Sequence, residues 1–218
     1  MWKSVERPSV EAVALLGDAR ELAARLGSPA GLEALAPAPV FLATGVSDLA
    51  GLRSFLRDYQ TRVLAPVELP AIQRAFVHAS RYELRELIAL DQELAQTPSL
   101  QAFAAASQAV GRAQVRRLRP LRDQRLARRY LQAVERGQAH GWHTLVYGVI
   151  LSLFSLPLRQ GLLNYGRQTM HSFISSAARP LELSEVDCRV LLEEITADLP
   201  REVERALADS ARSRLLAL

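Results

Sequence analysis

Residues 144–158, TLVYGVILSLFSLPL, form the longest uncharged apolar run of the chain. The run is about 15 residues long, whereas a helix needs about 20 apolar residues to cross the hydrocarbon core of a bilayer. A helix that is apolar on all sides is stable where other elements cover it. The run therefore predicts a buried core helix rather than a membrane span.

The segments on both sides of this run show the apolar spacing of amphipathic helices. Leu49, Leu52, Leu56 and Tyr59, for example, repeat at intervals of three and four and would line one helical face. Prolines and glycines separate such segments, and no useful run alternates apolar and polar residues as a half-buried strand would. We therefore expect an all-α protein, a bundle of about ten helices in a single domain over residues 1–218. The expected helices cover residues 9–26, 47–65, 70–79, 84–94, 100–119, 121–136, 141–155, 158–178, 184–198 and 200–216. Ser47 and Ser184 are the expected N-caps of two of them, and Pro66 is expected to end the second.

The composition is that of a globular protein, because 49% of the residues are hydrophobic and 23% are charged. The single cysteine, Cys188, excludes a disulfide framework and a multi-cysteine zinc site within one chain. The N-terminal residues lack an apolar segment after a basic start, so they do not indicate a signal peptide. We expect a cytoplasmic protein with no membrane association.

Charge is unevenly distributed along the chain. Residues 112–136 contain nine arginines against Asp123 and Glu135, whereas residues 182–209 contain nine acids against three arginines. Two interpretations remain open: two solvated faces, or complementary docking surfaces for partner chains or for each other. A nucleic-acid-binding regulator that uses residues 112–129 is the alternative function, but the region has no interleaved aromatic residues and the net charge of +4 is modest.

Candidate catalytic groups are few. The sequence contains no glycine-rich phosphate loop and no nucleophile elbow, and Cys188 has no evident histidine partner. His140 and His143 are three residues apart, so on one helix they would share a face and could contact one metal ion. Two ligands do not complete a site, and helix capping or core hydrogen bonding is the alternative role for both rings. We therefore predict no catalytic residue and no enzyme activity.

Five short motifs follow one another between residues 69 and 183. They are Leu69-Pro70-Ala71-Ile72, Leu87-Ile88-Ala89-Leu90-Asp91, Ala106-Ser107-Gln108-Ala109-Val110-Gly111-Arg112, His140 with Tyr147-Gly148-Val149, and Ser176-Ala177-Ala178-Arg179 with Leu183. In this order they resemble the motifs of the urease accessory protein UreF family. Residues 26–33 and 180–185 depart from the family pattern, and residues 1–46 are more divergent and loop-rich, so the chain resembles a divergent member.

The resemblance implies a role in urease maturation without catalysis. A protein of this family is expected to be an all-α homodimer and to act as a chaperone-like scaffold for the UreD/UreH accessory protein and the GTPase UreG. Together these proteins deliver nickel to the urease apoprotein. The resemblance thus implies that the complex handles nickel, with no cofactor bound permanently to this chain.

The resemblance also directs attention to particular residues. Small residues at Ser107, Gly111 and Gly148 suit close helix packing, since a glycine inside an apolar helix usually admits another backbone. The arginines are expected to contact partner proteins, and a charge at a helix C-terminus is the structural alternative for Arg179. The candidate partner-binding residues are Ser107, Gly111, Arg112, Arg116, Arg117, Gly148 and Arg179, with His140 and His143 as weak metal candidates.

Overall fold

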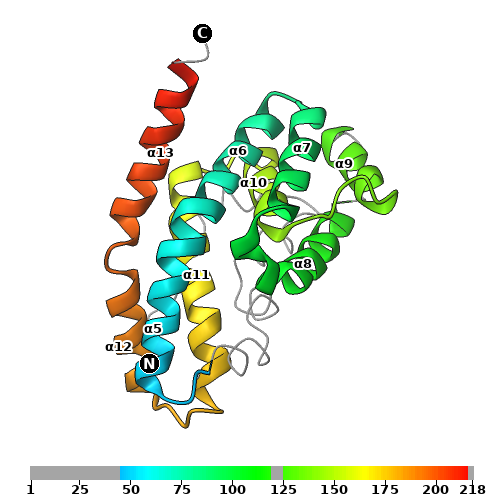
Figure 1. The fold of residues 1–218 in the computed structure, drawn as a ribbon. Helices are drawn as coiled ribbons and strands as arrows, with labels where there is room; N and C mark the ends of the chain where they lie inside the picture. The colour runs from blue at the N-terminus through cyan, green and yellow to red at the C-terminus, as the bar shows by residue number, and fades with distance from the viewer. Residues whose placement is uncertain (1–44, 119–124, 216–218) are drawn as a thin grey trace, which may run out of the picture.

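A computed structural model describes residues 45–118 and 125–215, with side chains up to residue 209 (Figure 1). All regular structure in these residues is helical, which confirms the all-α prediction. The elements are α5 (Leu49–Tyr59), η3 (Gln60–Glu68), α6 (Leu69–Ser80), α7 (Leu84–Ala95), η4 (Pro98–Phe103), α8 (Ala104–Arg117), α9 (Arg125–Glu135), α10 (His143–Leu153), α11 (Leu158–Ala178), α12 (Glu185–Thr196) and α13 (Leu199–Leu215). The expected count of about ten is slightly off, as the described residues hold nine α-helices. The helix predicted for residues 9–26 lies outside them.

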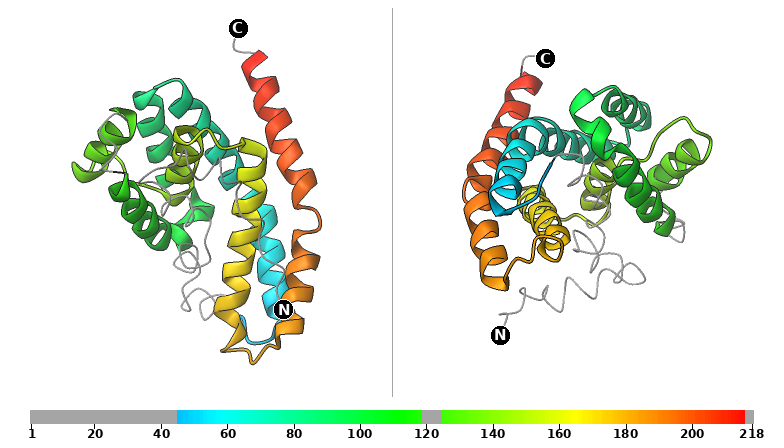
Figure 2. Two further views of the ribbon diagram at one scale, coloured as in Figure 1. Left: turned by 180° about the vertical axis from the view of Figure 1, so that it is seen from behind. Right: turned by 60° about the horizontal axis from the view of Figure 1, so that its bottom comes forward.

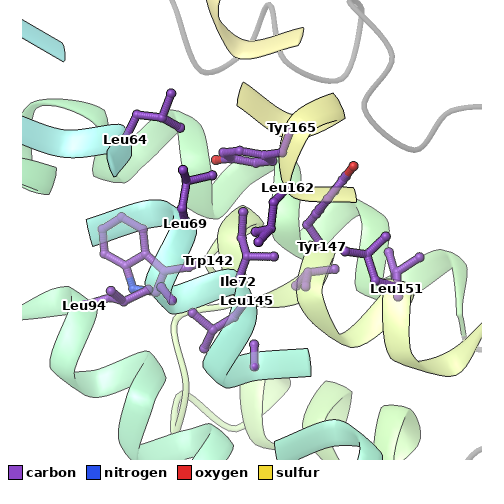
Figure 3. Close-up of a cluster of buried hydrophobic side chains, with 14 of the residues drawn as sticks. Leu64, Leu69, Ile72, Leu94, Trp142, Leu145, Tyr147, Leu151, Leu162 and Tyr165 are labelled. Carbon is purple, nitrogen blue, oxygen red and sulfur yellow. The ribbon is translucent and has the colours of Figure 1, made fainter. Parts of the chain in front are cut away.

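The apolar run forms α10, the most buried helix of the described structure. Every residue from His143 to Leu151 is buried. Helix α10 packs most extensively on α6 and next on α8. Figure 3 shows side chains from several helices meeting here, among them Trp142, Leu145, Ile72 and Leu162. The prediction of a buried core helix is confirmed, although α10 begins at residue 143 rather than 141 and ends at residue 153 rather than 155.

The prediction that Pro66 ends a helix is wrong. Helices α5, η3 and α6 follow one another without a break, and Pro66 lies inside η3, which is a π-helix. In this register the amide N–H of Leu69 donates to the carbonyl of Leu64, five residues earlier. A proline in an ordinary α-helix clashes with the carbonyl four residues earlier, and the wider π turn relieves that conflict. The result is one long helical rod from residue 49 to residue 80.

The other helices lie on two flanks of this rod. Helices α11, α12 and α13 line one flank, with α12 against α11 and α5. Helices α7, α8 and α9 form the opposite flank, and both views in Figure 2 place them far from α12 and α13. Consequently the arginine-rich helices and the acidic C-terminal helices face away from each other.

The helix ends follow local capping chemistry. At α5 the cap is Asp48 rather than the expected Ser47, and its carboxylate accepts a 2.7 Å hydrogen bond from the N–H of Gly51. At α12 the predicted cap Ser184 is confirmed: Ser184 and Asp187 form a reciprocal capping box. Gly137 has a φ of 72°, which glycine adopts without strain, and ends the turn after α9. None of the helices described is both long and apolar enough to span a bilayer.

Candidate functional site

Residues of three of the five sequence motifs meet at the loop between α9 and α10. Asp91 of α7 is fully buried beneath this loop. Its carboxylate accepts hydrogen bonds from the backbone N–H groups of His140, at 2.5 Å, and Gly141, at 2.9 Å. It also accepts a 2.6 Å hydrogen bond from the hydroxyl of Tyr130 in α9. One buried carboxylate therefore fixes the loop and the helix before it.

Helix α8 holds the other side of the same loop. The hydroxyl of Ser107 accepts a 3.2 Å hydrogen bond from the N–H of His143, the first residue of α10. One turn later, Gly111 lies directly against the loop backbone. A Cβ atom at this position would lie 2.1 Å from the carbonyl oxygen of Gly141 and 2.7 Å from the nitrogen of His143. The predicted close approach at Gly111 is present, and backbone occupies the space of the missing side chain.

Arg112 completes the junction from the exposed side. Its Nε donates a 2.8 Å hydrogen bond to the carbonyl of His140, and a terminal nitrogen donates a 3.2 Å bond to the Gln108 side chain. The guanidinium thus braces the loop of its own chain. Asp91, Ser107, Gly111 and Arg112 together position the start of α10, and we call this group the loop junction.

Gly148 lies at a second close approach, where α10 crosses α6. A Cβ atom there would lie 2.4 Å from the carbonyl oxygen of Ile72 and 2.9 Å from the Cβ of Ala75. The prediction that this glycine admits another backbone is therefore confirmed. This site, which we call the glycine crossing, is separate from the loop junction, because it joins α10 to α6 rather than to α8.

The helical face proposed for His140 and His143 does not form. His140 is in the loop before α10, and only His143 is in the helix. The His143 ring is fully buried against the rings of Tyr147 and Tyr165, and burial lowers its pKa to about 3. In the described part of the chain, no three His, Cys, Asp or Glu side chains are close enough to hold a metal ion.

The remaining candidate arginines lie away from the loop junction. Arg116 is exposed on α8, whereas the side chain of Arg117 lies outside the described residues. Arg179 is the exposed C-cap residue of α11. The seven predicted partner-binding residues therefore occupy several places rather than one surface, and three of them contact the interior of their own chain.

A second buried carboxylate lies inside the long helical rod. Glu68, 3% exposed, is the last residue of η3. Its carboxyl oxygens accept hydrogen bonds from the hydroxyls of Tyr59, at 2.7 Å, and Tyr165, at 3.0 Å. Burial raises the pKa of Glu68 to about 7, even though both hydroxyls act to lower it. The rod is thus joined to α11 through a carboxyl group that changes charge near neutral pH.

The loop junction and the glycine crossing both lie within a stretch that matches a known protein family. A family model described as UreF matches residues 46–196. The chain belongs to the UreF family. UreF proteins are urease accessory proteins, so this chain has a urease accessory role in general terms. No curated protein matches the chain.

All five sequence motifs lie within the UreF match. Several of their buried members, such as Ile72, Ser107 and Gly148, pack around α10. Residues 1–45 precede the match and α13 follows it.

The two buried carboxylates of this UreF core are not among the site residues predicted from the sequence. The signal was nevertheless present. Asp91 stands four residues after Leu87 and three before Leu94, on the apolar face of α7. Glu68 stands between Leu64 and Ile72 at the same kind of spacing. An acid in an apolar stripe indicates a buried group with hydrogen-bond partners, which only the fold can identify.

The Glu68 carboxyl group gives the UreF core a predictable pH dependence. Because its pKa is 4.5 in the reference state and about 7 in the folded chain, the folded state binds this proton more tightly. Its contribution to stability is complete below about pH 4.5 and is lost as the pH rises through 7. Between pH 5 and pH 8 this group should lower the free energy of unfolding of the parent chain by about 2.5 kcal/mol. We expect Glu68→Gln to abolish that decrease, as measured by urea unfolding.

The exposed Glu86 of α7 provides the matched control. Glu86→Gln makes the same chemical change on the surface and is expected to leave the pH dependence of the parent chain unchanged. Parallel stability curves for the parent and Glu68→Gln from pH 5 to pH 8 would contradict the assignment.

Proposed function

We propose that the chain is a non-catalytic scaffold of urease maturation. In this proposal it works in the cytoplasm as a homodimer. It brings a UreD/UreH-type protein and a UreG-type GTPase together with the urease apoprotein, so that nickel is inserted into the urease active site. Nickel is the cargo of the whole complex, and no cofactor stays bound to this chain. The observation that carries the proposal is the UreF match over residues 46–196, which includes both the loop junction and the glycine crossing.

The chemistry of the described side chains supports a scaffold. The only thiol, Cys188, is half-buried, and burial and the neighbouring Asp187 both raise its pKa. A thiol of raised pKa is a poor nucleophile at neutral pH. The side chains of Asp91, Ser107 and Arg112 at the loop junction make hydrogen bonds to the backbone of the same chain. Such bonds suit a rigid protein that presents surfaces to other proteins.

Arg179 supplies the test, because it is a motif residue that remains exposed. In a strain that has the urease genes, deletion of this gene is expected to abolish most urease activity, and the parent gene is expected to restore it. Arg179→Ala is expected to restore at most about a tenth of that activity and to co-purify less UreD/UreH-type and UreG-type protein. A loss of about 1.4 kcal/mol of binding free energy corresponds to such a tenfold change.

Arg167→Ala is the matched control, because Arg167 is exposed on the same helix but belongs to no family motif. It is expected to restore full activity. Both variants should melt within a few degrees of the parent. A charge at a helix end, such as Arg179, contributes about 0.3–1 kcal/mol, and an exposed substitution such as Arg167→Ala usually changes stability by no more than about 0.5 kcal/mol. Full urease activity in the deletion strain would contradict the proposed function itself.

A further inference from the structure

Helix α9 carries a row of arginines on its outer face. Arg125, Arg128, Arg129 and Gln132 follow the spacing i, i+3, i+4 and i+7, so they lie on one side of the helix, and all four are exposed. The opposite side, which includes Leu126 and Tyr130, is buried against α7 and α8. Among the described residues, none of the three arginines has an ion-pair or hydrogen-bond partner. We call Arg125, Arg128 and Arg129 the arginine row.

Acidic residues of the C-terminal helices α12 and α13, unlike the arginine row, have ion-pair partners. Glu194 of α12 pairs with Arg53, at 3.1 Å, and with Arg57, at 2.6 Å, both from α5. Glu204 of α13 pairs with Arg159 of α11 at 2.5 Å. Several of the acids are therefore already paired within the chain. The arginine row, by contrast, has no ion-pair partner in the described part of the chain, so we take it as the candidate docking surface.

Electrostatic repulsion within the arginine row destabilises α9 in the isolated chain. Like charges three and four residues apart on a helix repel one another. A partner that brings carboxylates to this face would relieve that repulsion and would meet guanidinium groups, which bind carboxylates through two parallel hydrogen bonds. The row also lies on the flank opposite α12 and α13 (Figure 2), so the acids of those two helices cannot reach it.

We propose that the arginine row docks an acidic surface of a protein partner within the urease accessory complex. This inference rests on the scaffold function proposed above and adds the chemistry of one contact. An acidic protein fits better than a nucleic acid because the face offers no aromatic platform: Tyr130 and Trp142 are buried, and the exposed large apolar residues described are Tyr82, Val186 and Val190, none of them on α8 or α9.

The test combines charge reversal with a matched control of equal net charge. The full-length parent chain is compared with R125E/R128E/R129E and with R62E/R85E/R167E, which reverses three exposed arginines on other helices. Affinity for the UreD/UreH-type and UreG-type proteins of the same genome is measured between 50 and 500 mM salt. Circular dichroism confirms the fold of each variant. A 20-base-pair DNA duplex serves as the nucleic-acid probe.

We expect reversal of the arginine row to weaken binding of one accessory protein at least tenfold at 150 mM salt, and to flatten the dependence on salt. The control should lose less than threefold. Equal losses in both variants, or none in either, would overturn the docking face while leaving the scaffold function intact. Tight duplex binding that depends on the arginine row, with accessory-protein binding unchanged, would instead assign the face to nucleic acid. If the parent chain binds neither accessory protein, the scaffold function fails and the docking face with it.

Discussion

Replacing Gly111 with alanine is expected to lower the free energy of unfolding by about 4 kcal/mol or more. The new methyl carbon would lie 2.1 Å from the carbonyl oxygen of Gly141 and 2.7 Å from the nitrogen of His143. Both are backbone atoms, so no flexible side chain can move aside. Helix α8 or the loop would have to shift, and the hydrogen bond from His143 to Ser107 would be lost with it. Urea unfolding followed by circular dichroism measures the change.

Helix α8 contains its own control for this substitution. Ala113 lies two residues after Gly111 and is exposed. Ala113→Leu adds more volume than Gly111→Ala, yet we expect it to change stability by no more than about 0.5 kcal/mol. A Gly111→Ala protein within about 1 kcal/mol of the parent would show that α8 and the loop are not in contact at this position.

Local chemistry explains why the helices could be predicted. The repeat of Leu49, Leu52, Leu56 and Tyr59 predicts a helix with one buried face, and Leu52, Leu56 and Tyr59 are buried as expected. The capping residue Ser184 acts through neighbours three residues away. Such interactions depend on sequence separations of a few residues, so the sequence alone determines them.

The predictions that are wrong concern either contacts between residues far apart in the sequence or the choice between an α-helical and a π-helical hydrogen-bond register. Pro66 ends an α-helix by local rules, but the long rod continues through it in a π register. His140 and His143 suit one helical face by spacing, but α10 begins at His143 because the loop before it is held by Asp91, nearly fifty residues earlier. Sequence rules that consider only neighbouring residues cannot predict that hydrogen bond.

The same distinction applies to the functional residues. The resemblance to UreF drew attention to Ser107, Gly111, Arg112 and Gly148, and the structure shows each of them in contact with the backbone or side chains of its own chain. These residues maintain the shape of the protein. In the proposals made above, partner recognition is therefore assigned to exposed groups such as Arg179 and the arginine row, which packing does not constrain.

Asp91 is the residue whose loss should show this dependence on distant contacts most directly. Asp91→Ala removes the acceptor for two backbone N–H groups and for the hydroxyl of Tyr130, all in the interior. Leaving buried donors unpaired costs about 1–3 kcal/mol each, so we expect a loss of about 4 kcal/mol in the free energy of unfolding. Hydrogen exchange at the amides of His140 and Gly141 should accelerate more than exchange within α11.

Two further substitutions separate the contributions to this loss. Tyr130→Phe removes one hydroxyl and should cost about 1 kcal/mol. Asp91→Asn keeps the shape of the side chain, but it offers only one acceptor oxygen and places an NH₂ group against the donors. Its decrease in the free energy of unfolding should therefore lie between those of Tyr130→Phe and Asp91→Ala. The effects of Asp91→Ala and Tyr130→Phe should not add in the double variant, because both remove the same hydrogen bond. Additive losses, with unchanged exchange at His140 and Gly141, would mean that the loop is fixed by Ser107 and Arg112 rather than by Asp91.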